Sequence, residues 1–252
     1  MRPALLALAL LAALPASGQI NAERMRRALE NDGVQASINA MVALATGNTE
    51  YFQLGVGGRT DWRRGEDLVF VVGQFDFSSA EDDVFVDEGH VHARYNHDYG
   101  PVIVYEVFGQ LERNSQQLLD TRALLGTGVR LRLVDEPLYG FALGTTPMFE
   151  YERLTEAAAE PDASVARWSN YASVRAALSE TASVTAVGYA QPRFGNLEDV
   201  RFLSQATLEV GVTRWLRLRM RANLRHDTRP PVGVERTDFS LSNGFVFLVP
   251  AQ

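Results

Sequence analysis

The chain has 252 residues, and its content of hydrophobic (46%), aromatic (10%) and charged (22%) residues is that of a folded protein, which excludes a disordered chain. The 24 basic residues are all arginine and are outnumbered by 31 acidic residues, so the net charge of −7 argues against a nucleic-acid partner. Cysteine is absent, which excludes disulfides, thiolate metal sites and cysteine nucleophiles.

The N-terminus has the pattern of an export signal. Arg2 is followed by an unbroken run of alanine and leucine over residues 4–14, Pro15 ends this run, and residues 16–18 are small. This order predicts a cleaved secretory signal peptide over residues 1–18. Residues 19–34 follow as a short periplasmic helix or linker, in which Asn21 is the predicted N-cap and Gly33 the predicted end.

From residue 35 onward the hydrophobic pattern has a period of two. The clearest case is the stretch 215–225, where apolar residues alternate with polar ones. Its apolar members are Leu216, Leu218, Met220, Ala222 and Leu224. Its polar members are Arg217, Arg219, Arg221, Asn223 and Arg225. A strand sorts such residues onto two faces, whereas a helix would scatter them around its axis.

Turn signals divide residues 35–249 into twelve such strands. The predicted bounds are 35–46, 49–63, 66–78, 84–98, 101–112, 119–134, 138–153, 165–178, 181–193, 199–213, 215–226 and 236–249. After the first hairpin, short turns alternate with longer loops at 79–83, 113–118, 154–164, 194–198 and 227–235. Strands of this length and this alternation predict an antiparallel transmembrane β-barrel of the bacterial outer membrane, followed by a tail at 250–252.

Aromatic residues gather near both ends of the predicted strands, for example Trp62 and Tyr139 at the short turns and Phe149 and Trp168 at the long loops. Two such belts are typical of a barrel in a membrane. The alternative is a soluble periplasmic lipocalin-like binding barrel, whose inner face is apolar. Alternation alone does not say which face is inside. The export signal, the strand length and the paired belts favour the membrane barrel.

Two short motifs resemble a known family. Residues 45–50 read Ala-Thr-Gly-Asn-Thr-Glu, and residues 122–131 contain the pair Gly126 and Gly128 within Arg-Ala-Leu-Leu-Gly-Thr-Gly-Val-Arg-Leu. Over residues 35–249 the chain is similar to the "salt-induced outer membrane protein" family, a domain family of unknown function. The resemblance implies an outer-membrane β-barrel linked to salt or osmotic stress, with no established substrate, cofactor or catalytic residue. The chain departs from the usual aromatic barrel terminus, since it ends Pro250-Ala251-Gln252.

The polar face of the strands carries charges of both signs. Besides a row of arginines near the C-terminus, it holds Glu106, Glu112, Asp120, Arg122, Glu150, Glu152, Arg167 and Arg201. These charges predict either a narrow passive channel or an envelope-structural barrel plugged by ion pairs. The predicted selectivity row comprises Arg217, Arg219, Arg221, Arg225, Glu88, His90, His92 and Arg94.

No catalytic motif is present, so the chain is not expected to be an enzyme and no catalytic residue is predicted. A weaker alternative is a surface-exposed outer-membrane hydrolase that pairs His226 with Ser78, Ser79 or Ser164. Glu88, His90 and His92 have a spacing that a metal ion accepts, but a fourth ligand is missing, and neither a metal site nor a cofactor is predicted. The expected partners are outer-membrane lipid and lipopolysaccharide, the barrel-assembly machinery and small solutes, with no nucleic acid.

Overall fold

A computed structural model describes residues 32–46, 50–80, 83–158, 160–213 and 216–247. The predicted signal peptide, residues 19–31 of the predicted N-terminal helix, residues 47–49 of the first hairpin and the tail lie outside the described residues. The first strand begins at Gly33, so Gly33 and Val34 belong to the sheet and not to a helix.

The described residues form one antiparallel sheet of twelve strands in sequence order. Its strands are β1 (Gly33–Ala45), β2 (Tyr51–Arg64), β3 (Asp67–Ala80), β4 (Asp83–Tyr99), β5 (Ile103–Asn114), β6 (Leu119–Asp135), β7 (Tyr139–Leu154), β8 (Ala163–Ala177), β9 (Ala182–Arg193), β10 (Asn196–Gly211), β11 (Leu216–Asp227) and β12 (Thr237–Phe247). Two short 3₁₀ helices, η1 (Ser115–Gln117) and η2 (Glu156–Ala158), lie in the loops after β5 and β7. The predicted all-β antiparallel architecture is confirmed.

The connections follow the predicted alternation only in part. The turns at Gly65 and Gly100 are tight, and both glycines have a positive φ (57° and 69°) that other residues rarely adopt. However, the connections at 81–82 and 194–195, which were predicted to be long, are equally short. They are short because β3, β4 and β10 extend further into these loops than the hydrophobic pattern indicates.

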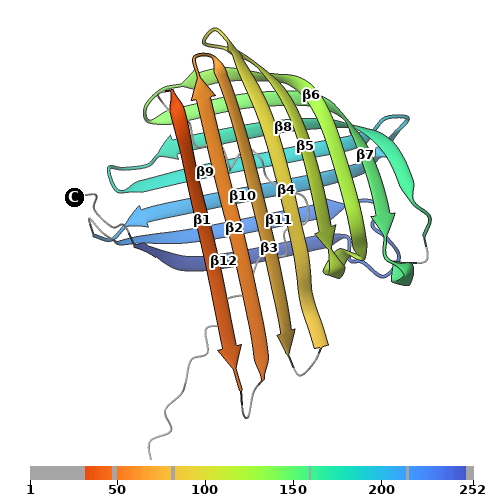
Figure 1. Ribbon diagram of the computed structural model, residues 1–252. Coiled ribbons are helices and arrows are strands. Elements are labelled where there is room, and N and C mark those ends of the chain that lie inside the picture. The colour runs from red at the N-terminus through yellow and green to blue at the C-terminus, as the bar shows by residue number, and fades with distance from the viewer. Residues whose placement is uncertain (1–31, 47–49, 81–82, 159, 214–215, 248–252) are drawn as a thin grey trace, which may run out of the picture.

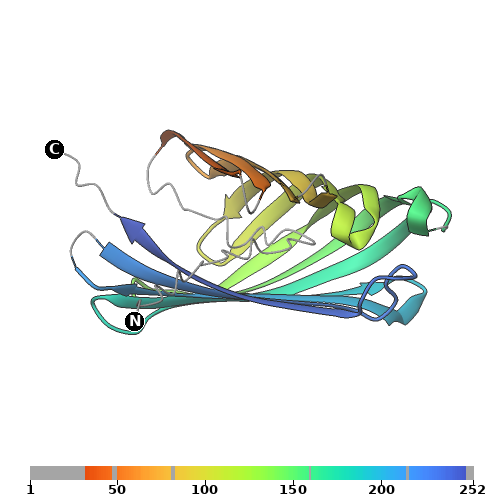
Figure 2. The ribbon, with the colours of Figure 1, turned by 90° about the horizontal axis from the view of Figure 1, so that it is seen from below.

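The sheet bends over on itself into two facing walls. Figure 1 shows β1–β4 running steeply in front, while β9–β12 run across them behind, and Figure 2 shows the two walls joined by the middle strands along one side. The successive strand pairs from β1 to β12 are all antiparallel neighbours. The two walls therefore enclose an interior that side chains from non-neighbouring strands share.

The predicted closed barrel is open at one seam. Among the described residues β1 pairs with β2 alone and β12 with β11 alone. In Figure 2 the two edge strands lie apart at the open side of the fold, because the walls that carry them run in different directions. The expectation of a closed barrel is thus not met in the described sheet, which has two free edges.

The interior holds charged and polar side chains together with some buried apolar ones, such as Phe70 and Val104, whereas large apolar side chains are exposed on the outward face. On β4 the side chains of Glu88, His92 and Arg94 are buried, whereas Phe85 and Val91 on the alternate face are about half exposed. Large apolar side chains are exposed on the outward face of other strands as well. The exposed apolar and aromatic residues on these strands include Trp62, Leu111, Leu125, Tyr139, Leu143, Phe149, Trp168, Phe202 and Phe239. Within the described residues, no helix has the length and apolar character needed to cross a membrane.

Candidate functional site

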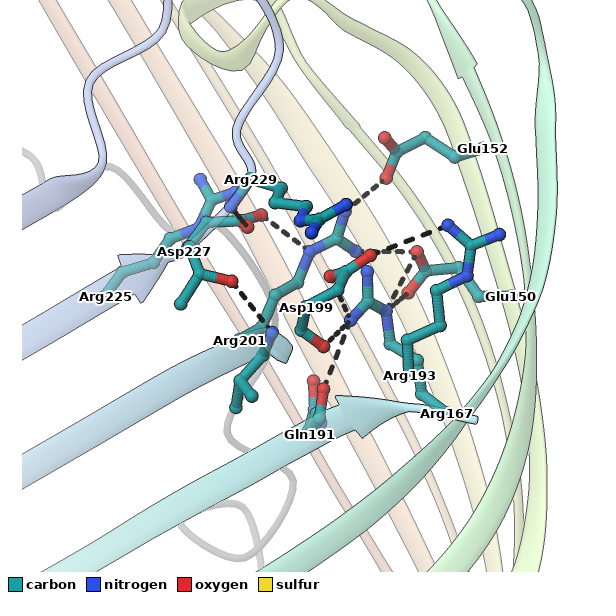
Figure 3. Close-up of polar contacts among 12 residues, drawn as sticks. Glu150, Glu152, Arg167, Gln191, Arg193, Asp199, Arg201, Arg225, Asp227 and Arg229 are labelled. Carbon is teal, nitrogen blue, oxygen red and sulfur yellow. Dashed lines mark hydrogen bonds and ion pairs between the residues drawn. The ribbon is translucent and has the colours of Figure 1, made fainter. Parts of the chain in front are cut away.

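Eight buried charged side chains form a connected ion lattice inside the fold, near the strand ends that carry the longer loops. They are Glu112, Arg122, Glu150, Glu152, Arg167, Asp199, Arg201 and Asp227. At its centre, Arg201 on β10 donates from Nη1 to Glu150 (2.7 Å), from Nη2 to Glu152 (3.0 Å) and from Nε to Asp227 (2.8 Å). Figure 3 shows Glu150 and Glu152, from β7, and Asp227, from β11, around the Arg201 guanidinium.

Two further arginines extend the ion lattice to either side. Arg122 on β6 donates to Glu152 through Nε (2.9 Å) and Nη2 (2.7 Å) and to Glu112 through Nη1 (3.0 Å). Arg167 on β8 pairs with Asp199 at 2.9 Å and with Glu150 at 3.5 Å. Each carboxylate faces at least one guanidinium, so the two signs alternate at this level of the interior, although three guanidinium groups against five carboxylates leave these eight residues with an excess of two negative charges.

The loops above the ion lattice also contact one another. The amide of Val232, in the loop after β11, donates to Oε1 of Glu160, in the loop after β7, over 2.8 Å. The amide of Thr155 donates to the carbonyl of Leu118 over 2.7 Å, so the loops after β5 and β7 are joined as well. Contacts between the loops therefore cover the long-loop end of the interior, in addition to the charged side chains that fill it.

Below the ion lattice lies a layer of aromatic rings. His92 lies between Phe70 and Phe108, with ring centroids 5.9 Å and 5.6 Å away. The guanidinium of Arg59 lies over Phe70 and that of Arg94 over Phe108, at 4.7 Å and 5.1 Å from the ring centroids. Such cation–π contacts stabilise arginine in a partly desolvated interior.

Inward-facing glycines make room for this layer. A methyl group at Gly126 would lie 2.6 Å from the ring of Phe108, and one at Gly144 would overlap the ring of Tyr171. Gly128 approaches the backbone and the hydroxyl group of Thr146 in the same way. The Gly-x-Gly pair at 126 and 128 thus lets side chains from neighbouring strands fill the interior.

The predicted residues of β4 share one inward face but make separate contacts. Glu88 accepts from Asn114 (2.7 Å), Nδ1 of His92 lies 3.1 Å from Oε1 of Gln110, and Arg94 donates to Glu106 (3.3 Å). His90 is partly buried on the same face. In the part of the chain that the structure describes, no three His, Asp or Glu side chains are grouped so as to hold a metal ion.

The arginine row of β11 lies beside the ion lattice and not within it. Arg217 and Arg219 both pair with Glu209 on β10, at 3.6 Å and 2.6 Å, and their side chains are 47% and 34% exposed. Arg225 lies 4.0 Å from Asp238, and Arg221 stands opposite Thr207 in the sheet. The arginines of the row share one face of the strand, as the alternation predicts. However, Glu209 pairs with two of them and neutralises part of the row's positive charge.

Two other predicted placements differ from the structure. Asp120, predicted to face inward, pairs instead with Arg153 at 2.6 Å, and both side chains are about half exposed. Nδ1 of His226 lies 2.8 Å from the hydroxyl of Thr237, and its cross-strand neighbours are Phe202 and Thr237. Ser78, one of the serines considered as its partner, is fully buried on β3. The structure therefore assigns His226 a contact with Thr237.

A cavity of about 580 Å³ occupies the opposite, short-turn half of the interior. Between it and the ion lattice, the space beside His92, Phe108 and Tyr171 shrinks to about 20 Å³, roughly enough for one water molecule. The interior thus has three levels along its length: charge pairs, aromatic rings and an open cavity.

The sequence had placed most members of the ion lattice on the inward face but had not singled them out. Alternation gives the face of a residue, and the opposite charges of Arg122, Glu150 and Arg201 are visible in the sequence. Alternation does not show which residues of neighbouring strands lie side by side, because that depends on the register in which the strands pair. Arg122 stands directly opposite Glu112 and Glu152, and only the register shows this.

Comparison with known proteins places the chain in a family. The model of the family described as "Protein of unknown function, DUF481" matches residues 38–248. No curated protein matches the chain. Among solved structures, the translocator domain of the autotransporter NalP from Neisseria meningitidis is similar at 13% sequence identity and a TM-score of 0.36, over 88% of this chain and 91% of that chain.

Proposed function

The chain belongs to the family described as "Protein of unknown function, DUF481", and from the geometry of this member we propose that it is an outer-membrane β-barrel whose lumen is blocked at the long-loop end. In this proposal it has an envelope-structural role and is not an enzyme. The observation that carries the proposal is the placement of charge inside and apolar surface outside. A soluble lipocalin-like barrel requires the reverse, because its interior is filled with apolar side chains.

The exterior fits a lipid environment. Large apolar side chains are exposed on the outward face of the strands, among them Leu125 (63%) and Leu111 (58%). Exposed aromatic residues occur near both strand ends, with Tyr99 and Tyr139 by the short turns and Phe149 and Trp168 by the long loops. Two aromatic belts around an apolar band are the pattern of a barrel in the outer membrane, and they support lipid and lipopolysaccharide as partners.

The two sheet edges are suited to pair with each other. β1 contains no proline and no charged residue, so it lacks the features that protect a free edge from pairing. By register, Ser37 on β1 and Ser240 and Ser242 on β12 lie on the polar face, while Ile38 and Leu241 lie on the apolar face. We propose that β1 and β12 pair in the membrane, where unpaired backbone groups in lipid cost several kcal/mol each. Insertion by the barrel-assembly machinery belongs to the same proposal.

The ion lattice favours a blocked barrel over a narrow channel. A solute crossing at this level would have to separate Arg201 from Glu150 and Glu152, which leaves buried charges unpaired. Residues of β5, β6, β7, β8, β10 and β11 contribute to this level. A stress-linked structural role, which the resemblance to salt-induced outer membrane proteins suggests, fits a barrel stiffened in this way.

Single-channel recording in a planar bilayer tests the blocked lumen. The mature chain, refolded in detergent and inserted, is expected to give no current steps, while a shift of the unheated band on a gel shows that it is folded. A triple variant, Glu150→Ala, Glu152→Ala and Arg201→Ala, removes the centre of the ion lattice and is expected to conduct. The matched control carries Asp87→Ala and Arg113→Ala, an exposed ion pair, and is expected to stay silent.

Discrete steps from the wild-type chain would overturn the blocked lumen and support the second candidate, a narrow passive channel. The cavity at the short-turn end is the observation that favours that candidate, because it already hollows half of the interior. In that case the sign of the reversal potential in asymmetric salt tests whether the arginine row on β11 attracts anions.

A further inference from the structure

The cavity in the short-turn half of the interior is rich in arginine. Arg63, Arg130, Arg132 and Arg175 line it, and they come from β2, β6 and β8. Two carboxylates, Asp98 and Asp135, line it as well. The lining thus holds more guanidinium groups than carboxylates.

One carboxylate is shared by two of these arginines. Oδ2 of Asp98 accepts from Arg63 at 3.3 Å and from Arg132 at 3.4 Å, and Arg132 also donates to the carbonyl of Gly100 at 2.8 Å. A single negative charge thus faces two guanidinium groups, and one of them, that of Arg132, is also held by a backbone carbonyl that carries no formal charge.

Arg175, which also lines the cavity, is held by backbone carbonyls as well. Its Nη1 donates to the carbonyl of Pro137 and its Nη2 to that of Glu136, each at 3.2 Å, and Asp135 lies 3.6 Å away. These carbonyls belong to the turn between β6 and β7. The turn therefore orients Arg175 while leaving the cavity positively charged.

Between the arginines the walls are apolar. Leu68, Phe141, Ala142 and Val187 line the cavity, and Leu68, Ala142 and Val187 are buried. A volume of about 580 Å³ lies within the range of small-molecule sites. The combination of charged ends and apolar walls selects ligands that carry charge on an apolar body.

We propose that this cavity binds a small organic dianion with an apolar body, of the aromatic or aliphatic dicarboxylate class. Guanidinium groups recognise carboxylates through paired N–H···O bonds, and the cavity offers them at two places, Arg63 with Arg132 around Asp98 and Arg175 beside Asp135, which suits an anion with two carboxylates. The ligand enters from the short-turn end, where Asp135 and Arg175 are each at least half exposed. The site does not depend on whether the lumen conducts, so it stands or falls separately from the blocked barrel.

Isothermal titration calorimetry on the refolded full chain in non-ionic detergent tests the site. The probe is isophthalate, and the matched neutral probe is isophthalamide, which has the same ring and substitution pattern without the charge. Isophthalate is expected to bind at one site per chain, with at least tenfold higher affinity than isophthalamide. Raising the salt concentration is expected to weaken isophthalate binding alone.

Three variants locate the binding. The double variant Arg130→Gln and Arg132→Gln is expected to weaken isophthalate binding at least tenfold. Thr185→Phe keeps every arginine but places a ring in the cavity, which Thr185 lines, and is expected to abolish binding. Arg153→Gln removes an exposed arginine outside the cavity and is expected to leave the affinity within twofold of wild type.

The proposal is overturned if isophthalate does not bind the wild-type chain, if isophthalamide binds equally well, or if Thr185→Phe binds as the wild type does. A double variant that fails to show a folded band on an unheated gel is replaced by Arg175→Gln, whose main contacts are with the turn carbonyls. Unchanged affinity for isophthalate in that variant likewise overturns the proposal.

Discussion

Nη1 of Arg201 donates to Oε1 of Glu150 over 2.7 Å, and the two residues stand on β10 and β7, which are not neighbours in the sheet. This bond therefore crosses the interior and does not follow the sheet. The bond from the hydroxyl of Tyr171 on β8 to Glu106 on β5, at 2.7 Å, does the same one level below. Contacts of this kind join strands that are not neighbours in the sheet, and the first two variants below test them.

Replacing Arg201 is expected to destabilise the fold strongly. Arg201→Gln leaves Glu150, Glu152 and Asp227 buried with too little positive charge, and breaking a buried ion pair from one side costs about 3–5 kcal/mol. The urea concentration at which the folded gel band disappears measures the effect. The control, Arg193→Gln, removes a guanidinium that is 44% exposed and 3.6 Å from Asp199. It is expected to cost at most about 1 kcal/mol, and equal losses in both variants would contradict the central role of Arg201.

The Tyr171 hydroxyl is expected to matter more than an exposed counterpart. Tyr171→Phe removes a donor from the buried Glu106 carboxylate, a loss of about 1.5–3 kcal/mol for a bond to a charged group. Tyr151→Phe removes a bond to Asp162 of similar length, 2.6 Å, at an exposed position, and is expected to have little effect. Urea unfolding followed by tryptophan fluorescence measures both. A larger loss of unfolding free energy in Tyr151→Phe than in Tyr171→Phe would show that the bond from Tyr171 to Glu106 contributes little to stability.

Gly144 is expected to tolerate no side chain. A methyl group there would overlap the ring of Tyr171, so Gly144→Ala forces a shift in a filled interior, at a cost of about 1–3 kcal/mol. Gly109→Ala is the matched control in another strand, since the atom nearest to its added methyl is a carbonyl oxygen of Leu124 at 3.9 Å. The temperature at which the compact gel band is lost compares them. Equal temperatures for the two variants would refute the packing role of Gly144.

The arginine row on β11 is expected to contribute little to stability. The triple variant Arg217→Gln, Arg219→Gln and Arg221→Gln removes the contacts to Glu209, which involve partly exposed side chains and are worth at most about 1 kcal/mol each. Its urea midpoint is expected to stay well above that of Arg201→Gln. A triple variant with a urea midpoint as low as that of Arg201→Gln would show that this row, and not the ion lattice, contributes most to the stability of the interior.

The seam is testable because the chain contains no native cysteine. Ala40→Cys on β1 is combined in turn with Phe239→Cys, Leu241→Cys, Asn243→Cys or Phe245→Cys, all on the outward face of β12 by register. Pairing of β1 and β12 in the membrane brings one partner within disulfide distance and predicts cross-linking for one or two adjacent members of the panel. No cross-link in any of the four would show that the barrel stays open.

The strands could be predicted from the sequence because a sheet with two different faces imposes a hydrophobic period of two on each strand. The pattern located β11 within one or two residues at each end, and it placed Glu88 and Arg94 on one face. It missed the lengths of the loops at 81–82 and 194–195, since polar residues at a strand end look like loop residues. It singled out the arginine row on β11 because that row is contiguous in the sequence. The ion lattice is contiguous only in space, where Arg122 and Glu152 meet through the register of β6 and β7.

The order in which strands join has a kinetic consequence. Every strand pairs with its sequence neighbour, so the hairpins need only short chain closures, which form quickly. The bond from Arg201 to Glu150 instead joins positions 51 residues apart, and it requires β7 and β10 to be in place together. We therefore expect a folding chain to acquire its strand content before its resistance to denaturant. Until β7 and β10 are both in place, Glu150 and Arg201 lack each other as partners, and this is the interval in which the assembly machinery proposed above would act.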